Sequence, residues 1–504
     1  MIENIFSSIH SFWPEITMSL TFVGAMVVEF ITGRQGKSST GMITGFFVLA
    51  GFILTILQLP FQNPEARLLF GTMYTIDPFA LFFKYLILAT GIVIIVFSMQ
   101  SEELRRQDTV GEFFCFIAAA TFGMLLMTGA SHLLMIYLSI ELVSISSYVL
   151  AGFSKKEHRS AEASLKYVLF GAASSGIMLF GISIIYGLTG ALDIYTIQQG
   201  LASGTAAHHT FALWPLLIAV VMILAGFGYK ISAVPFHFWT PDVYEGAPIT
   251  VTAFLAVASK AAGFAIMLRF FHATFFDALV DVGKWVSLPH VEWNLLLAVL
   301  SVLTMTLGNI IAVWQDNLKR MLAYSSIAHA GYLLMGAVVM SDLGISAILL
   351  YFVIYFFMNL GAFYIVMVVA DKIGSEHIDD YRGLGKRAPI VGVGLSVFLV
   401  SLTGLPPLAG FVGKWMLFSA VIEANFIWLA IIGVINSAIS LYYYARVFRN
   451  MYLRAPVDGD ESPITFSPLV IVMTILFIVP NIVFGLYFGP LVSIAQQSVR
   501  MFLP

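Results

Sequence analysis

The stretch Gly226-Phe-Gly-Tyr-Lys-Ile-Ser-Ala-Val-Pro235 decides how this chain folds. It closes an apolar run that begins near residue 211, and Lys230 stands shortly before the proline. A second stretch, Gly404-Leu-Pro-Pro-Leu-Ala-Gly-Phe-Val-Gly-Lys414, interrupts the apolar run 388–420. Proline removes a backbone donor and glycine loosens a helix, so both runs are predicted to break and leave carbonyl groups free. Each break would lie beside a lysine.

The composition of the chain is that of a membrane protein. The 504 residues are 59% hydrophobic and 11% charged, with a mean hydropathy of +0.92. About fourteen apolar runs have the length of roughly 20 residues that crosses a bilayer as a helix. They start near residues 13, 41, 77, 112, 132, 163, 211, 248, 294, 319, 344, 388, 424 and 467. Backbone that faces lipid must bond internally, and the runs are too long for barrel strands, so we predict an all-α polytopic membrane protein.

The two interrupted runs occupy corresponding places in two successive groups of five predicted helices. We predict one membrane domain over 1–504 that contains two repeats, 112–272 and 294–450. Because five is an odd number of helices, the second repeat would be inverted relative to the first. Paired broken helices in corresponding places indicate an ion path.

The basic residues in the loops predict the orientation. Those on one side are Arg34, Lys37, Arg105, Arg106, Lys155, Lys156, Arg159, Lys319, Arg320, Lys372, Arg382, Lys386, Arg387, Arg446, Arg449 and Arg454. Those on the other side are only Arg67, Arg269, Lys284 and Arg500. Basic loops stay in the cytoplasm, so both termini are predicted to face away from it. The first helix lacks a basic region and a cleavage site, which predicts that it is retained.

The remaining five lysines lie inside apolar runs: Lys84, Lys166, Lys230, Lys260 and Lys414. A lysine in a spanning helix costs at least about 2.5–3.5 kcal/mol, so it must face water or partners inside the bundle. Burial makes an amine release its proton more readily, and a nearby carboxylate opposes this release. Buried lysines beside a buried carboxylate, Glu141, therefore predict proton transfer.

Each buried group is given a predicted role. Glu141 and Lys230 would form a switching pair, and Lys166, on the intervening helix, would modulate it. Lys260 has small neighbours that leave room for water and would be a relay, whereas Lys414 would be the counterpart of Lys230 at the far end. The alternatives are a static ion pair for Glu141 and a Lys260 side chain that extends to the membrane surface.

Histidines and Lys84 carry weaker signals. His329 lies well inside the second repeat, and it is either a relay or a core histidine with one hydrogen bond. His132 and His237 lie near the ends of apolar runs. Lys84 lies near the start of its helix, so its amine is predicted to reach the membrane surface.

Several motifs are absent from the sequence. It has no glycine-rich nucleotide loop after a strand, no phosphate loop, and no Cys or His pattern for a metal cluster or haem. Its one cysteine, Cys115, lies in an apolar run, so no disulfide framework is predicted. The chain itself is therefore predicted to bind no cofactor and carry no electrons, and its energy must come from a partner complex or an ion gradient.

Two further stretches complete a distinctive set. They are Glu141-Leu-Val-Ser-Ile-Ser-Ser-Tyr-Val-Leu150 and Lys319-Arg-Met-Leu-Ala-Tyr-Ser-Ser-Ile-Ala-His329. The set also includes the second break and the aromatic loop 231–248, which is predicted to fold back into the bundle. Together these stretches resemble the antiporter-like subunits of proton-pumping NADH:quinone oxidoreductase, respiratory complex I. The resemblance covers nearly the whole chain. Lys414, the Ser-Ile-Ser-Ser-Tyr after Glu141 and the end soon after the last helix favour the N branch over the L and M branches.

The resemblance implies a role for the chain within a larger complex. Glu141, Lys166, Lys230, Lys260 and Lys414 would form the proton path, driven by quinone reduction elsewhere. NADH, FMN, iron–sulfur clusters and quinone would be bound by partner subunits. The partners would be other membrane-arm subunits, among them M and small subunits such as K, together with the lipid bilayer and no nucleic acid. The location would be the inner (plasma) membrane of a bacterium.

Three alternatives stay open at this point. The nearest is a subunit of a multi-subunit Na⁺/H⁺ antiporter or a membrane-bound hydrogenase, against which Lys414 argues mildly. A stand-alone permease would need a cluster of polar groups for its solute, and the sequence has none. A purely structural subunit would keep its charges without using them.

Overall fold

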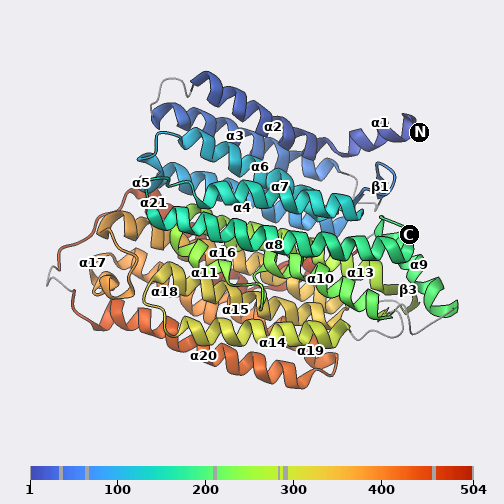
Figure 1. Cartoon of the computed structure of the whole chain (residues 1–504). Helices are drawn as coiled ribbons and strands as arrows, with labels where there is room; N and C mark the ends of the chain where they lie inside the picture. The colour runs from blue at the N-terminus through green and yellow to red at the C-terminus, as the bar shows by residue number, and fades with distance from the viewer. Residues whose placement is uncertain are drawn as a thin grey trace.

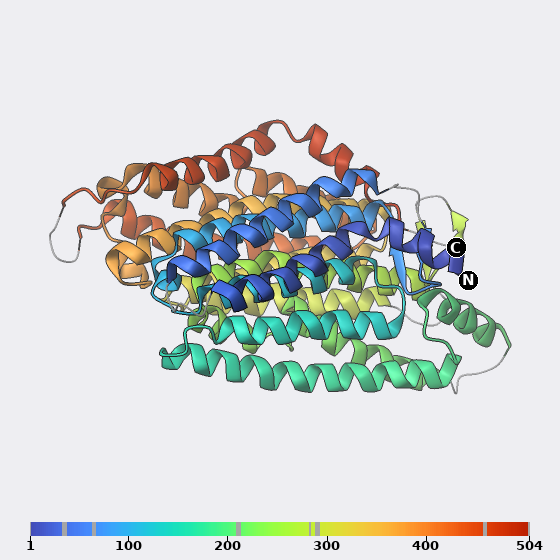
Figure 2. The ribbon, with the colours of Figure 1, turned by 90° about the horizontal axis from the view of Figure 1, so that it is seen from above.

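A computed structural model describes residues 2–32, 38–62, 67–207, 213–281, 284–287, 293–456 and 461–501. Long helices run along one common axis (Figures 1 and 2). The spanning helices are α2 (Trp13–Thr32), α3 (Ser38–Gln58), α4 (Pro78–Gln100), α6 (Val110–Gly129), α7 (Leu133–Ala151), α8 (His158–Thr189), α10 (Leu213–Ile231), α12 (Ile249–Phe254) with α13 (Lys260–Phe275), α14 (Trp293–Ala312), α15 (Leu318–Val339), α16 (Asp342–Ile373), α20 (Ile427–Leu453) and α21 (Pro468–Leu486).

These helices confirm the predicted fold class. In the described part of the chain, 13 helices are long and apolar enough to cross a membrane. The one remaining predicted run, which starts near 388, is divided into α18 (Pro389–Thr403) and α19 (Ala409–Glu423), which both pack along the long helix α16. The predicted starts all lie within 5 residues of a helix start, because the apolar runs have the length that the bilayer imposes.

Short elements connect the spanning helices. The helices are α1 (Ile2–Ser11), η2 (Leu59–Phe61), α5 (Glu102–Arg105), α9 (Ile194–Ala207), α11 (Trp239–Gly246), the π-helical turn η3 (Leu255–Ser259), η4 (Ile378–Tyr381), α17 (Leu384–Arg387) and α22 (Gly489–Gln497). The strands form two antiparallel pairs, β1 (Arg67–Leu69) with β2 (Tyr74–Ile76) and β3 (Phe276–Asp281) with β4 (Lys284–Ser287). The sequence analysis predicted no strands. Both pairs lie between spanning helices, where backbone groups need not face lipid.

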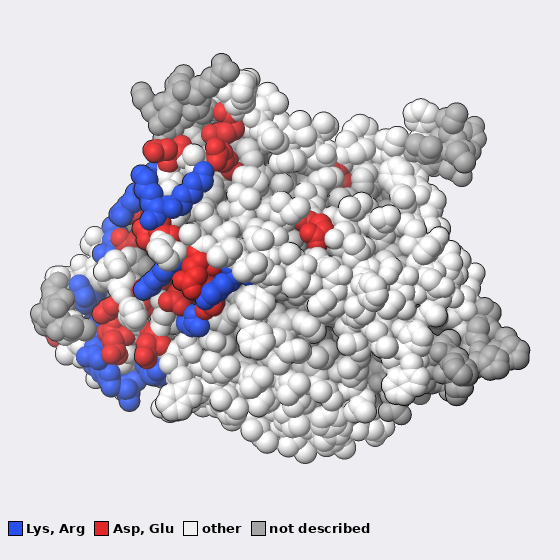
Figure 3. All heavy atoms as spheres, viewed as in Figure 1, with Lys and Arg blue, Asp and Glu red and all other residues white. Residues whose placement is uncertain are grey.

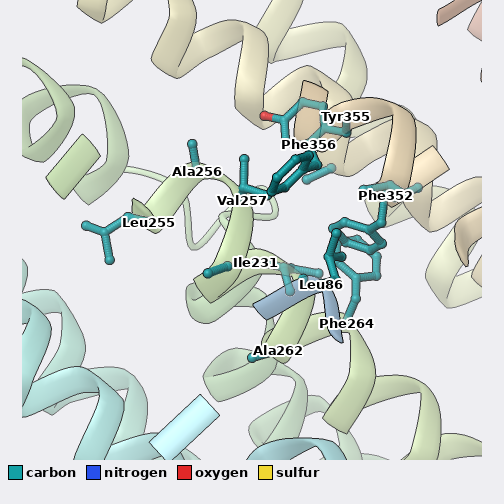
Figure 4. Packing of buried hydrophobic residues seen from close by; sticks show 14 of the residues in the cluster. Leu86, Ile231, Leu255, Ala256, Val257, Ala262, Phe264, Phe352, Tyr355 and Phe356 are labelled. Atoms are coloured by element: carbon teal, nitrogen blue, oxygen red, sulfur yellow. The ribbon is translucent and has the colours of Figure 1, made fainter. Parts of the chain in front are cut away.

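The centre of the bundle is formed by the segment from α12 to α13. Every residue from Ile249 to Phe275 is buried. Around the π-helical turn, the ring of Phe264 packs edge-on against Phe352 at 5.5 Å, and Val257 lies beside Phe356 (Figure 4). The outer helices, such as α2, α8 and α21, leave large apolar side chains exposed, as expected for surfaces that face lipid or other subunits.

Charged side chains gather at one end of the molecule (Figure 3). This charged end includes Arg105, Arg159, Asp242, Lys386 and Arg446. The two ends of the chain lie together at the opposite end of the bundle (Figures 1 and 2). Of the loop charges used to predict orientation, Arg34, Lys37 and the side chain of Lys284 lie outside the described residues.

Two residues that were assigned to loops are buried instead. Arg269 is 1% exposed and Lys319 is 3% exposed. The Arg269 guanidinium binds Asp77 through two bonds of 2.7 and 2.8 Å and donates to the Thr128 carbonyl at 3.0 Å. Asp77 also caps α4 by accepting from the Ala80 N–H at 2.8 Å. No local pattern in the sequence indicates this pair, because its members are 192 residues apart.

The prediction for Lys84 was wrong. Its amine does not reach the membrane surface but is fully buried against Glu15, with 2.5 Å between Nζ and Oε1. Lys84 also donates to Gln62 at 3.1 Å, and the Tyr74 hydroxyl donates to Glu15 at 3.0 Å. An oppositely charged partner on α2 therefore holds the amine inside.

Replacement of Arg269 tests the contribution of the buried ion pair to stability. Arg269→Met leaves the Asp77 carboxylate buried without its partner, which we expect to cost about 3–5 kcal/mol. The double variant Arg269→Met/Asp77→Asn keeps a cap for α4 without a buried charge and should recover part of this loss. Thermal denaturation in detergent measures both. Equal stability of the single variant and the parent chain would contradict the prediction.

Candidate functional site

The first predicted break lies where α10 ends at Ile231. Ser232 adopts a positive φ of 62°, and the chain then folds back into the bundle as α11, as predicted, with Trp239 and Tyr244 buried. Lys230, in the last turn of α10, is 1% exposed. Its amine lies 3.5 Å from the Ser144 hydroxyl of α7. The break thus leaves a buried ammonium group beside a hydroxyl.

Glu141 and Lys230 are near each other but do not form an ion pair. Glu141 is half-buried and not buried as predicted, because α7 carries it on the edge of an exposed stripe. Its carboxylate acts electrostatically on Lys230, and its buried Oε1 has no hydrogen-bond partner in the described part of the chain. Ser144 lies one helical turn from Glu141 on α7, on the side that meets Lys230. The Ser144 hydroxyl thus lies beside the Lys230 amine on the side of α7 that carries Glu141, and a hydroxyl can both accept and donate a proton. The sequence motif after Glu141 contains this serine.

Lys166 is not buried as predicted. Its side chain is 36% exposed and its amine pairs with Glu162 and Asp242, both at 2.7 Å. Asp242 also binds Arg320 at 2.6 Å. Burial raises the pKa of the Asp242 carboxyl, but the bonds from Lys166 and Arg320 outweigh burial and hold the pKa below its usual range. Lys166 therefore belongs to an ion-pair network at the charged end, and the sequence analysis missed Asp242 and Arg320.

Lys260 follows the π-helical turn η3 directly. Such turns are rare and are often found at functional sites. The Lys260 amine is 2% exposed and donates to the Ser326 carbonyl of α15 at 2.7 Å. The stem of Lys230 packs over Gly263, one turn away on α13, where a Cβ atom would meet Lys230 Cγ at 3.3 Å. No proline or glycine marks the π-helical turn, so the sequence analysis could not find it.

His329 lies near both Lys260 and Lys414. Lys260 and Lys414 both act on its ring electrostatically. Its Nδ1 is 2.6 Å from the Tyr351 hydroxyl, and its side chain is 2% exposed. With the carbonyl of Ser326 before it and Tyr332 after it, His329 belongs to a polar face along α15. His132 and His237, by contrast, lie at the start of α7 and in the first break.

Lys414 lies at the second break. Its amine donates to the Thr403 carbonyl and the Ser437 hydroxyl, both at 2.8 Å, and lies 4.4 Å from the centre of the Tyr332 ring. Thr403 ends α18, so its carbonyl is one of those that the break frees. Gly404 has a φ of +86°, and a Cβ there would come within 2.7 Å of Lys414 Cδ. Glycine is therefore required at this turn.

Lys230, Lys260, His329 and Lys414 together form what we call the lysine row. None of its three lysines has an ion pair with a carboxylate among the described residues. The row crosses the core along α15, which lies between α7 and α20 (Figure 1). Within the same described ranges, no group of three or more His, Cys, Asp or Glu residues could hold a metal ion.

The fold agrees with the comparisons to known proteins. Residues 130–440 match the family described as "NADH:quinone oxidoreductase/Mrp antiporter, TM". Over 498 residues, 97% of this chain and 94% of its relative, the chain is 44% identical to NADH-quinone oxidoreductase subunit N 2 of Chloroherpeton thalassium. The chain belongs to the NADH-quinone oxidoreductase subunit N family. This confirms the resemblance drawn from the sequence motifs.

Solved structures support the same assignment. A chain of respiratory complex I from Thermus thermophilus superposes with a TM-score of 0.75 at 28% identity, covering 95% of this chain and 98% of that chain. A chain of the Mrp complex from Dietzia superposes with a TM-score of 0.80 at 18% identity, covering 97% of each chain. The second match shows the fold alone. The antiporter-like fold is thus common to the subunit N family and to Mrp complexes.

Replacement of Lys414 should separate its function from its contribution to stability. Lys414→Met removes a buried ammonium group that has no carboxylate partner, and Thr403 still accepts a 2.8 Å bond from Ser437. No polar group is left unpaired, so we expect a thermal midpoint equal to or above that of the parent chain. The measurement is thermal denaturation of Lys414→Met, compared with that of Arg269→Met and the parent chain. A large loss of stability in Lys414→Met would contradict this account.

Proposed function

We propose that this chain is the subunit N of a proton-translocating NADH:quinone oxidoreductase and that protons cross it through the lysine row. The observation that carries the proposal is the burial of three ammonium groups without carboxylate partners. The family relationship supports membership in such an oxidoreductase. The chain would act as a non-redox translocase subunit, and NADH, FMN, iron–sulfur clusters and quinone would be bound by its partners.

The chemistry of the row suits proton movement. A buried amine without a counter-charge changes its protonation state with small changes in its surroundings. The neighbouring groups, which are the Ser144 and Ser437 hydroxyls and the His329 ring, can both accept and donate a proton. A charged row could therefore respond to charge movements in a partner subunit, with each charge moved across the membrane worth about 2.3 kcal/mol per 100 mV.

The ends of the row would face neighbouring subunits. Glu141 shares one stripe of α7 with Leu138 and Ile145, both 58% exposed. A carboxylate on that stripe is costly next to lipid, so a small membrane subunit such as K would cover it. At the other end, Ser437 shares one stripe of α20 with the exposed Val434 and Leu441, where the antiporter-like subunit M would pack.

We further propose that 112–272 and 294–450 are inverted repeats. In both, an apolar helix ends just before a residue with positive φ, Ser232 or Gly404. The location would be the inner membrane of a bacterium, with the charged end in the cytoplasm and both termini on the other side. A role in an Mrp-type antiporter or a hydrogenase has less support, since full-length relatives at 44% identity carry the subunit N name.

Substitution of Lys230 tests the proposed function. Proton-transfer groups contribute about 10²–10⁴-fold to a rate, so Lys230→Ala in the assembled complex should lower proton pumping by at least about tenfold. Lys230→Arg keeps the positive charge but cannot release a proton, so it should also fail. The measurement is NADH-driven acidification of vesicles that contain the complex, with NADH–quinone activity as a reference.

The control is Lys156→Gln, which removes an exposed lysine between α7 and α8. It should leave pumping unchanged. Undiminished pumping in both Lys230 variants would show that the lysine row does not carry protons.

A further inference from the structure

Lys319, like Lys84, is a buried lysine that lies outside the lysine row. It stands in the first turn of α15, and its side chain is 4% exposed. The amine donates to the Ala247 carbonyl at 2.9 Å and pairs with Glu376 at 3.0 Å. Ala247 connects α11 to α12, so Lys319 lies where the folded-back segment turns toward the π-helical turn. Unlike the lysines of the row, it has a carboxylate partner.

Glu376 connects this buried amine to the surface of the charged end. Its side chain is 24% exposed. The Leu318 N–H donates to the Glu376 carbonyl at 2.8 Å, and the Asn317 amide donates to Oε2 at 3.1 Å. The carboxylate is thus fixed between water on one side and the Lys319 amine on the other.

A second carboxylate, Glu103 of α5, faces the same amine. The Ser154 hydroxyl donates to Glu103 at 3.4 Å. Burial raises the pKa of the Glu103 carboxyl above its ordinary value; Lys319 opposes this shift, and Glu376 adds to it. Glu102 on the same helix and Asp371 of α16 are the other acidic groups nearby. The cluster therefore contains a carboxyl group, that of Glu103, which burial makes a better holder of a proton than an ordinary carboxyl group.

The polar face of α15 continues from Lys319 toward the lysine row. Lys319 and Ser326 are two turns apart on one face, a rise of about 10 Å. The Ser326 carbonyl already binds the Lys260 amine at 2.7 Å. Tyr244, one turn before Ala247, lies near Tyr355 and Ser326. The Tyr355 hydroxyl donates to the Ser326 hydroxyl at 2.9 Å.

Buried hydroxyl groups lie along this same path. Tyr244 and Thr250, on either side of Ala247, have no geometrically acceptable hydrogen-bond partner among the described residues. Buried hydroxyl groups without protein partners are typical sites of bound water. Water at these two hydroxyls would connect Lys319 with Lys260.

We propose that Lys319, Glu376 and Glu103 form the proton inlet of the second half of the chain, which takes protons at the charged end and delivers them toward Lys260. The proposal rests on the proposed function. A proton from the aqueous side forms an O–H bond on Glu376, and the Lys319 ammonium releases one proton inward to water at Tyr244. The Glu376 proton then moves to the Lys319 amine, which restores the ion pair. One proton is taken up for each proton released.

A static clamp is the competing explanation. Arg320, the next residue, binds Asp242 at 2.6 Å and Glu245 at 2.8 Å, so the start of α15 also holds α11 in place. Lys319 could serve the same purpose through Ala247. The two explanations differ in their dependence on proton concentration, because a clamp does not need Glu376 to bind a proton.

The test compares Glu376→Gln, Glu376→Asp and Glu103→Gln in the intact complex, reconstituted in vesicles with the charged end outside. Pumping is measured from about pH 6 to about pH 8.5. The whole range lies above the ordinary pKa of a carboxyl group, and free protons are scarcest at its upper end. Charged inlets raise capture rates by at least about tenfold. We therefore expect Glu376→Gln to pump about tenfold more slowly than the parent complex at the highest pH and to approach it at the lowest.

Controls distinguish this proposal from the proposed function. Glu376→Asp keeps a carboxyl group and should have the pH profile of the parent complex. Lys372→Gln, at an exposed position of the charged end, should have it too. Glu103→Gln should show the same trend as Glu376→Gln and serves if the latter does not assemble. If Glu376→Gln pumps at the same fraction of the parent rate at every pH, the inlet proposal is wrong and the static clamp is favoured. Normal pumping in Lys260→Ala would instead overturn the proposed function.

Discussion

The structure depends on the cost of holding ammonium groups in an apolar bundle. Charged groups in such a medium are tolerated only when partners or water surround them. Two solutions occur in this chain. Arg269 and Lys84 are each bonded to a buried carboxylate, with closest distances of 2.7 and 2.5 Å. Lys230, Lys260 and Lys414 instead bind carbonyl and hydroxyl oxygens.

In the proposed function, this difference separates structural charges from those that release protons. A fully buried carboxylate at bonding distance fixes a positive charge, because loss of the proton would leave that carboxylate unpaired. Glu376 differs because it is partly exposed, so in the proposed inlet it can take up a proton from water before Lys319 releases one. A carbonyl or hydroxyl oxygen stabilises the ammonium group less, so the neutral amine is within reach. The second helix break supplies one of these oxygens, the Thr403 carbonyl. The Ser144 hydroxyl, the Ser326 carbonyl and the Ser437 hydroxyl come from the continuous helices α7, α15 and α20. Uncharged oxygen partners on both kinds of helix are thus what would make the lysine row suitable for proton transfer.

Much of this arrangement could be predicted from the sequence, since the bilayer fixes helix length and proline with glycine marks the breaks. Pairing between distant residues could not. Arg269 and Lys319 read as loop charges because they stand near the ends of apolar runs, and their carboxylate partners are far along the chain. Lys166 was misread for the opposite reason. It stands within an apolar run, but the long helix α8 extends beyond the apolar part of the bundle at the charged end. The π-helical turn before Lys260 has no residue signature.

The central claim is that water and side chains connect the lysines of the row. The most direct measurement is a high-resolution structure of the intact complex in which ordered water is visible. The account predicts water between Lys230 and Glu141, beside Lys260, and from His329 to Lys414, with each amine hydrogen-bonded to it. Dry, apolar gaps between the amines, too wide for a proton to cross, would contradict the account.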